Sequence, residues 1–542
     1  MGYVFVDNDK VPSVEGKSLF DFADALKVRV PTSCGRTGEC HECIVQIIQG
    51  HQALNNKTAV ENFLGPNFRL SCQAKIEDAN QDVQFDVLRR QPKILSKGIK
   101  RDHDFSPSTY IKDYKVISDS FKRDEILNIK LTPIYGIAVD LGTTTVVCSL
   151  VNLENGDLVG SASFENPQRF GGSDTLHRIS YDTGEFPGEL QAVIIAGLNF
   201  EIGELCKKHK VRRRHIYEMI VVGNTTMRDI FFGINVYSVG QKPYKSLTQL
   251  DLENGDKDST SLVEKAKRLN IRIHPDANIH SPPLIGCHIG SDVTADLVAI
   301  GLDILDDNFI LLDVGTNTEI VLGNLGNLVA ASCPAGPAFE GGDVTYAMPG
   351  YDGAIEHFRI QNGVQEFSTI NDQSPQGICG SGLIDLIASL RKNSIMNEFG
   401  VFSNGEDNFH LENANGINVS RSDLSALAQA KAANYCGQSI ALRNSGIDLR
   451  DFSNLFLSGG FANYIDIDNA KSIGFLVDIP NVKIKKVGNA ALEGAIMLLK
   501  NKKLRTKFEL LVKSIRHLEL ETDEHFFEHF VEGCQFKKLA LM

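Results

Sequence analysis

The chain has 542 residues, of which 42% are hydrophobic and 23% charged, a composition typical of a globular protein with more than one hydrophobic core. Acidic residues outnumber basic residues by 68 to 55, and the formal net charge of −13 argues against nucleic acid or an anionic membrane surface as the main partner. No apolar stretch reaches the roughly 20 residues that a membrane-spanning helix needs. Eleven cysteines, most of them far apart in sequence, favour a reducing, cytoplasmic compartment over a disulfide framework.

Residues 1–85 predict a small domain of strands and one helix. Tyr3-Val-Phe-Val6 is typical of the first strand of a hairpin, and residues 18–27 carry apolar side chains at helical spacing, with Ser18 as the N-cap. Residues 44–48 predict a further strand. This order favours a ferredoxin-like (β-grasp) domain. The charged residues 86–130 that follow predict a linker with little fold of its own.

Four cysteines in this first domain have the spacing of an iron–sulfur site. Cys34, Cys40 and Cys43 lie on one short loop, and Cys72 follows from a later segment. Thiolates grouped in this way are typical of a 2Fe-2S cluster, which carries one electron. A zinc site usually takes two Cys-x-x-Cys pairs, and here only Cys40 and Cys43 are paired. A redox dithiol would leave Cys34 and Cys72 without a role, so the pattern favours the cluster.

A pattern of strand, small-residue turn and strand occurs twice in the rest of the chain. Residues 136–150 contain Asp140-Leu-Gly-Thr-Thr144 at the turn, and residues 309–322 contain Asp313-Val-Gly-Thr-Asn317. Two copies indicate an internal repeat, and the alternation of strands and helices around them predicts two related α/β lobes.

Each of these turns has the groups that hold a phosphate and a magnesium ion. Free amides and hydroxyls can bind phosphate oxygens, and the aspartate can bind Mg²⁺, usually through water. A later Ser458-Gly-Gly460 lets the backbone approach a flat base or a ribose. One such turn alone is also typical of an ordinary hairpin, but the combination predicts an ATP site. Its candidate residues are Asp140, Gly142, Thr143, Thr144, Asp313, Gly315, Thr316, Asn317, Gly459 and Gly460.

Several further motifs give the chain a resemblance to a known family. They are Asn166-Pro-Gln168 with residues 172–179, residues 222–227, 332–341 and 377–385, Ser458-Gly-Gly-Phe461, and residues 487–495. With these motifs in this order, the chain resembles the reductive activators of corrinoid proteins. In that family a ferredoxin module is fused to an ATPase of the actin, sugar-kinase and heat-shock-chaperone type.

The resemblance implies a fold and a division of the chain. We expect a 2Fe-2S domain over residues 1–85, a linker over 86–130, a first actin-like ATPase subdomain over 131–205, and the remaining ATPase region with the second lobe over 206–542.

The resemblance also implies an activity. The protein would use ATP and Mg²⁺ to pass one electron from its cluster to the corrinoid protein of a methyltransferase system, returning inactive Co(II) to Co(I). It implies an external electron donor and a homodimer. Asp140 and Asp313 would organise Mg²⁺, and Glu340 is a candidate for positioning the attacking water. Two alternatives stay open: a ferredoxin-linked small-molecule kinase, and a non-enzymatic, ATP-gated electron-transfer adaptor.

Overall fold

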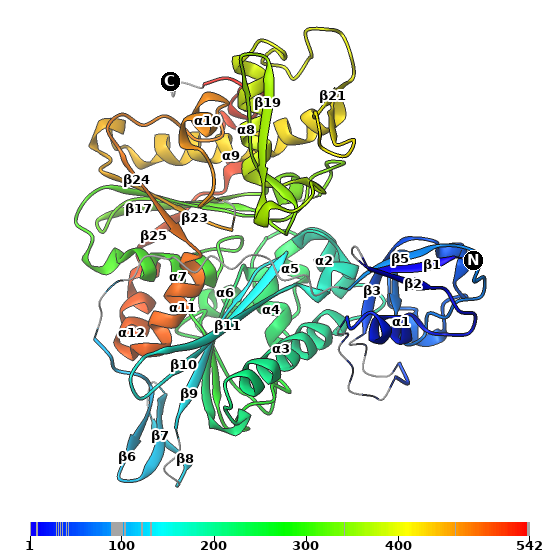
Figure 1. Ribbon diagram of the computed structural model, residues 1–542. Coiled ribbons are helices and arrows are strands. Elements are labelled where there is room, and N and C mark those ends of the chain that lie inside the picture. Colours follow the sequence, from blue (N-terminus) through cyan, green and yellow to red (C-terminus); the bar gives the residue numbers. More distant parts are fainter. Residues whose placement is uncertain are drawn as a thin grey trace.

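The computed structural model in Figure 1 shows a small N-terminal domain beside a larger body of two lobes. The structure describes residues 2–538 except positions 7–8, 29, 31, 33, 35, 39–40, 42, 88–100, 102–103, 121–122, 130–132, 341 and 461. Cys40 and Phe461 therefore lie outside the described residues. Within these ranges no helix combines the length and the apolar character that crossing a bilayer requires.

The N-terminal domain has a five-stranded sheet and the α-helix α1; the sequence predicts this helix, the first hairpin and the strand at residues 44–48. The helix α1, Leu19–Ala25, begins at Ser18, whose hydroxyl accepts from the backbone N–H of Asp21 while the Asp21 carboxylate accepts from the backbone N–H of Ser18. The sheet order is β2-β1-β5-β3-β4. These strands span β1 Tyr3–Val6, β2 Asp9–Pro12, β3 Ile44–Gln49, β4 Phe68–Leu70 and β5 Val83–Val87. The predicted ferredoxin-like domain is confirmed.

The region expected to be a linker contains a sheet, which corrects the expectation for residues 109–128. Strands β6 Thr109–Lys112, β7 Lys115–Ser120 and β8 Arg123–Asn128 pair in antiparallel order. The reason is burial: Val116 and Leu127 are buried in a core shared with the body. The Thr109 hydroxyl also donates to the Glu218 carboxylate at 3.2 Å, which fixes β6 to the first lobe.

The first lobe is built on a six-stranded sheet of order β11-β10-β9-β12-β14-β13. Strands β9, β10 and β11 form an antiparallel meander, and β12 and β14 continue it in parallel with β9. The strands are β9 Tyr135–Leu141, β10 Thr145–Asn152, β11 Leu158–Glu165, β12 Ile216–Val222, β13 Leu262–Lys265 and β14 Asn278–Ser281. The helices that follow in this lobe are α2 Thr175–Asp182, α3 Glu189–Lys208, α4 Thr225–Phe232, α5 Tyr237–Gly240 and α6 Leu247–Glu253.

The second lobe repeats this arrangement, as the duplicated sequence pattern predicts. Its sheet has the order β24-β23-β15-β16-β17-β25, with an antiparallel meander of β15, β16 and β17 and with β23 and β24 parallel to β15. The strands are β15 Phe309–Val314, β16 Thr318–Asn324, β17 Asn327–Cys333, β23 Asn454–Ser458, β24 Lys483–Gly488 and β25 Ile515–His517. The main helices are α8 Gly380–Lys392, α9 Arg421–Ser445, α10 Ile467–Ser472 and α13 Phe526–Gly533, and smaller strands β18 to β22 lie between residues 354 and 420. Helix α12, Lys502–Leu511, lies instead against the first lobe, where Arg505 forms an ion pair with Glu218 of β12.

Two helices lie between the lobes and join them. Helices α7, Ser291–Ile300, and α11, Ala490–Lys500, pack closely because residue 494 is glycine: a Cβ there would lie 1.9 Å from the carbonyl oxygen of Ala295. Figure 1 shows the pair between the two sheets. The core around them takes buried side chains from both sheets, among them Ala138, Val147, Leu311, Val321 and Phe456.

The sheets also correct the expected division of the ATPase region at residue 205. Strands β12 and β14 follow that position but hydrogen-bond into the same sheet as β9. The first lobe therefore extends to α7, and the second begins at β15. The sequence pattern missed this because the crossover through α3 separates β12 from its partner β9 by many residues.

Candidate functional site

The two repeated turns face each other across a cavity between the lobes. The first turn joins β9 to β10, and the second joins β15 to β16. The cavity has a volume of about 260 Å³. Every residue that the sequence proposed for the nucleotide site lines it: Asp140, Gly142, Thr143, Thr144, Asp313, Gly315, Thr316, Asn317, Glu340, Gly459 and Gly460.

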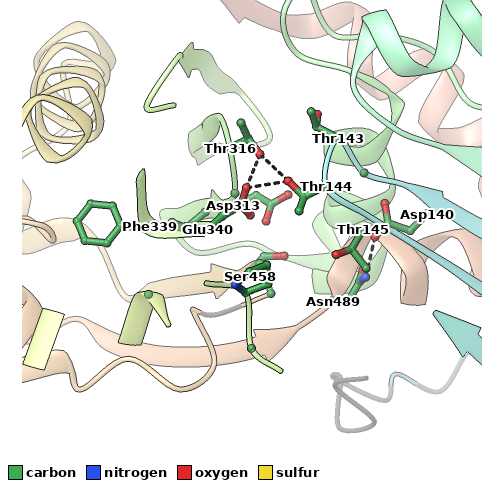
Figure 2. A pocket seen from close by; sticks show the side chains of 18 of the residues that line it. Asp140, Thr143, Thr144, Thr145, Asp313, Thr316, Phe339, Glu340, Ser458 and Asn489 are labelled. Carbon is green, nitrogen blue, oxygen red and sulfur yellow. Dashed lines mark hydrogen bonds between the residues drawn. The ribbon is translucent and has the colours of Figure 1, made fainter. Parts of the chain in front are cut away.

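Glu340 connects the two turns. Its Oε2 accepts hydrogen bonds from the hydroxyls of Thr144, at 3.3 Å, and Thr316. The two hydroxyl oxygens are 3.4 Å apart, so three side chains from two lobes meet at one point, as Figure 2 shows. Burial raises the pKa of the Glu340 carboxyl, while these hydroxyls favour its ionised form. A half-buried carboxylate beside threonine hydroxyls can hold a water molecule or accept a proton.

Three aspartates give the cavity a strong attraction for a cation. Burial, aided by the charge of Asp313, raises the pKa of Asp140 to about 7, although a hydrogen bond from Asn489 opposes the shift. Burial and the charge of Asp313 raise the pKa of Asp292 to about 8. Burial also raises the pKa of Asp313 itself. Ionised carboxylates crowded in a buried site repel each other, and a divalent cation removes that repulsion.

Two asparagines hold the first turn in place. The Asn489 side-chain amide donates to Asp140 Oδ2 at 2.7 Å, and the Asn224 amide donates to the Thr143 hydroxyl at 3.0 Å. Each asparagine also caps a helix, α11 for Asn489 and α4 for Asn224. The turn is therefore positioned by two helix starts that come from distant parts of the chain.

The cavity is also suited to an anion. Helices α7 and α11 both begin at it, since Asp292, Asn489 and Ala491 are among its lining residues. The first N–H groups of a helix are free, and its N-terminus carries a partial positive charge. These two helix starts therefore favour a phosphate group beside the aspartates.

The glycine pair after β23 forms another wall of the cavity. Gly459 has φ +112°, and a Cβ there would lie 2.1 Å from the carbonyl oxygen of Val314. Only glycine fits that position. A Cβ on Gly460 would meet no atom within 4 Å, so this residue presents open backbone to the cavity.

Sequence reasoning missed Asp292, Asn224 and Asn489. Asn224 and Asn489 lie within motifs that support the family resemblance, but those motifs did not indicate what the two side chains contact. Asp292 follows Gly290-Ser291 at the start of α7, and no local pattern marked it.

In the N-terminal domain, the structure brings together two of the predicted cluster ligands. The sulfur atoms of Cys43 and Cys72 are 3.4 Å apart, and both side chains are buried. The hydrogen bond from the Cys43 thiol lowers the pKa of Cys72 to about 7 and raises that of Cys43. Cys34 lies close enough for its charge to raise the pKa of Cys72, and Cys40 lies outside the described residues.

The spacing of Cys43 and Cys72 suits two thiolates bound to the same metal ion. A 2Fe-2S cluster needs only two thiolates at each iron. Two thiolates bound to one tetrahedral metal at about 2.3 Å lie roughly 3.8 Å apart, close to the spacing of Cys43 and Cys72. These two residues would hold one iron.

Three family models match successive parts of the chain. Residues 4–77 match the 2Fe-2S iron-sulfur cluster binding domain, residues 135–304 match the RACo middle region, and residues 307–541 match the C-terminal domain of RACo, described as the ASKHA domain. Their limits agree with the N-terminal domain and the two lobes.

Two characterised relatives and one solved structure are similar over most of the chain. A corrinoid activation enzyme, RamQ, of Eubacterium limosum is 34% identical over 436 residues, which is 76% of this chain and 71% of the relative. The Co(II) methylated amine-specific corrinoid protein reductase of Methanosarcina barkeri is 24% identical over 417 residues, 72% of this chain and 75% of that protein. A solved structure entitled reductive activator for corrinoid, iron-sulfur protein has a TM-score of 0.73 and 25% identity, with 99% of this chain and 98% of that chain covered.

Proposed function

The chain belongs to the RACo family, and from that membership we propose which of its residues carry the family's reaction. The protein is an ATP-dependent reductase that activates a corrinoid protein, returning Co(II) to Co(I) with one electron from a 2Fe-2S cluster. One observation supports this function beyond the similarity. A single chain combines the buried thiol pair of Cys43 and Cys72 with a cavity that is lined from each lobe by a turn suited to bind phosphate.

We propose that Asp140 and Asp313 hold Mg²⁺, largely through water, because they lie on opposite lobes and line the same cavity. Thr143, Thr144, Thr316 and Asn317 would bind phosphate oxygens, with Gly142 and Gly315 leaving the backbone amides accessible. Gly459 and Gly460 would lie against the adenosine, where the backbone is open.

Glu340 is proposed to position the attacking water. Its carboxylate accepts hydrogen bonds from a threonine hydroxyl of each turn, and burial raises its pKa, which makes it a stronger base. Asp292 is proposed as a third aspartate that helps to hold Mg²⁺, since it lines the cavity at the start of α7. Closure of the two lobes on ATP would then change which state of the partner is bound.

Cys34, Cys40, Cys43 and Cys72 are proposed as the cluster ligands. When bound, a 2Fe-2S cluster supplies a site that gains and loses a single electron. The chain's own contribution is to bury Cys43 and Cys72 and to donate to the Cys72 sulfur from the Gln73 side chain at 3.4 Å, which favours the thiolate.

The proposal includes the cellular compartment, the electron donor and the oligomeric state. We place the protein in a reducing, cytoplasmic compartment, because none of the ten cysteines that the structure describes takes part in a disulfide. An external electron donor must recharge the cluster after each transfer. A homodimer is part of the same proposal and rests on the family alone; its molar mass in solution tests it.

The decisive experiment is spectroscopic. The protein, with its cluster reduced, is mixed anaerobically with Mg²⁺, ATP and a Co(II) corrinoid protein, and the absorbance of Co(I) is followed. We expect Co(I) to appear only when ATP and both proteins are present. Steady ATP hydrolysis without Co(I), or a phosphorylated small molecule as the product, would instead favour the adaptor or kinase alternatives.

A further inference from the structure

One family motif, Asn166-Pro-Gln168 with residues 172–179, contributes no residue to the cavity wall and no cluster ligand. It lies within residues 166–182, here called the bridge segment, which contain the short helix η3 Pro167–Gly171 and helix α2 Thr175–Asp182. Figure 1 shows α2 on the side of the first lobe that faces the N-terminal sheet. Its contacts lead in two directions, toward the nucleotide turn and toward the cluster domain.

At one end, the bridge segment holds the back of the first phosphate turn. Asn166 donates from its side chain to the carbonyl of Gly142 at 2.8 Å and from its backbone N–H to the carbonyl of Thr144 at 2.8 Å. The Arg178 guanidinium donates to the carbonyl of Thr143 at 2.7 Å. Three successive carbonyls of the turn are therefore fixed by two residues of this one segment.

Arg178 makes these contacts as a buried cation. Its side chain is 1% exposed, and its other partners are the carbonyl of Gly172, the side-chain oxygen of Gln168 and the sulfur of Met227. Burial lowers its pKa to about 9. A buried positive charge held by neutral groups gains energy when an anion enters nearby. A triphosphate on the front of the turn would supply that anion.

At the other end, the bridge segment contacts the N-terminal domain. The Tyr181 hydroxyl donates to the backbone carbonyl of Phe63, and the Phe170 ring packs edge-on against the Phe63 ring at 5.5 Å between centroids. Tyr181 lies one helical turn from Arg178 on α2, so one short helix reaches both the nucleotide turn and this domain.

From Phe63 the contacts continue into the cysteine loop. The Phe63 ring stacks on the His41 ring at 4.2 Å, and His41 lies between two predicted cluster ligands in sequence. A second contact supports the same docking: His41 Nδ1 lies 2.9 Å from Glu189 Oε2, at the start of α3. The cysteine loop thus rests directly on the lobe that contains the first phosphate turn.

We propose that the bridge segment couples the two sites, so that nucleotide bound at the first turn tightens the docking of the cluster domain on α2. Phosphate bound to the amides and hydroxyls of the turn polarises its peptide groups, which strengthens the hydrogen bonds that Asn166 and Arg178 make to the carbonyls behind. The better-held bridge segment then presents Tyr181 on α2 and Phe170 on η3 to Phe63 in a fixed position. By reciprocity, a docked cluster domain raises the affinity for nucleotide by the same factor.

Hydrogen exchange of the full chain, with its cluster bound and oxidised, measures this coupling. Exchange is followed in residues 59–68, which contain Phe63, with and without a saturating, non-hydrolysable ATP analogue and Mg²⁺. The inference rests on the proposed function only in requiring that nucleotide binds the cavity, and a separate titration of the analogue establishes this. In the wild-type chain we expect exchange in this segment to slow by at least about fivefold.

Two variants make the test specific. Tyr181→Phe removes the hydroxyl but keeps the ring, and we expect it to cut the effect of nucleotide below about twofold and to weaken analogue binding by a matching factor. Tyr114→Phe is the matched control, because Tyr114 is 74% exposed between β6 and β7, at the opposite end of the first lobe from α2 in Figure 1. In this variant the effect of nucleotide should equal that in the wild type. Bound analogue with unchanged or faster exchange, or a full effect in Tyr181→Phe, would overturn the coupling. A wild-type chain that does not bind the analogue would overturn the proposed function as well.

Discussion

The hydroxyl oxygens of Thr144 and Thr316 lie 3.4 Å apart although 172 positions separate the two residues in sequence. Each belongs to one of the two repeated turns, and Glu340 accepts a hydrogen bond from both. A phosphate group entering the cavity would compete for the same hydroxyls. Binding of a phosphate group at these hydroxyls would therefore change the contact that joins the two lobes.

The first prediction concerns Glu340. Replacing it with Gln keeps the size of the side chain but removes the negative charge that can accept a proton. If Glu340 positions the attacking water, ATP hydrolysis should fall by about 100-fold or more while nucleotide affinity changes little. Steady-state hydrolysis and equilibrium binding of an ATP analogue separate the two effects. Glu356→Gln, at another glutamate that lines the cavity, is the matched control. Hydrolysis within about threefold of the wild type would show that Glu340 only joins the lobes.

The second prediction concerns the cluster. Cys43→Ser replaces a buried sulfur ligand with a hydroxyl, a poor ligand for iron, so the cluster should be lost or unstable. Reduction of the corrinoid partner should then be abolished, while nucleotide binding in the distant cavity is retained. Iron content, visible absorbance and analogue binding are the measurements. Cys534→Ser, a half-buried cysteine near the C-terminus, should behave as the wild type. A Cys43→Ser chain that still reduces Co(II) would remove the cluster from its assigned role.

The third prediction is a pH dependence that originates at Asp140. Its pKa rises from 3.8 to about 7 on folding because the carboxyl is buried. A raised folded pKa means that stability is greatest below the unfolded value and is lost as the pH rises through the folded value. Without nucleotide, Asp140→Asn should therefore melt at an increasingly higher temperature than the wild type between about pH 4 and pH 7, and the difference should level off above pH 7. The full pKa shift of Asp140 corresponds to at most about 4 kcal/mol in the free energy of unfolding. A difference in melting temperature that does not vary with pH would contradict this origin.

The same carboxyl predicts how magnesium and nucleotide bind. Mg²⁺ requires the ionised form of Asp140, so in the wild type the affinity for Mg²⁺-ATP should rise as the pH increases through about 7. Asp140→Asn should bind weakly and with a smaller pH step, to which the other aspartates of the cavity still contribute. Titrations of Mg²⁺-ATP analogue at several pH values check the slope, and an affinity that falls with increasing pH would exclude Asp140 as a metal-binding group.

Much of the site could be predicted from the sequence because its signals are local. A turn such as Asp140-Leu-Gly-Thr-Thr144 combines strand, glycine and hydroxyl residues within one short stretch, and its duplicate at Asp313 identifies the second lobe. Asp292 and Asn489 could not be found in this way. They reach the cavity from the starts of two helices, α7 and α11, whose packing depends on the whole fold.

The sheet at residues 109–128 was missed for a related reason. Its strands are short and carry many charges, so the local pattern resembles a linker. Their pairing is stabilised by burial of Val116 and Leu127 against the body, which composition alone does not reveal. The role of Cys40 stays a prediction, since that residue lies outside the described part of the chain.

The last prediction uses the two adjacent glycines as a matched pair. Gly459→Ala forces a Cβ into a position 2.1 Å from the carbonyl of Val314 at a φ of +112°, so the loop after β23 must shift. Backbone strain of this kind costs about 1–3 kcal/mol, and the clash adds to it. We expect a clear loss of thermal stability and of nucleotide binding.

Gly460→Ala meets no atom within 4 Å of the new Cβ, and its φ is not in the left-handed region, so the protein should fold with nearly wild-type stability. Because Gly460 lines the cavity, the added methyl group should instead weaken nucleotide binding directly. Thermal unfolding without ligand, together with analogue titration, separates the two variants. Equal stability losses would mean that the clash at Gly459 is relieved by a small movement of the loop. Wild-type nucleotide affinity in Gly460→Ala would place the adenosine elsewhere in the cavity.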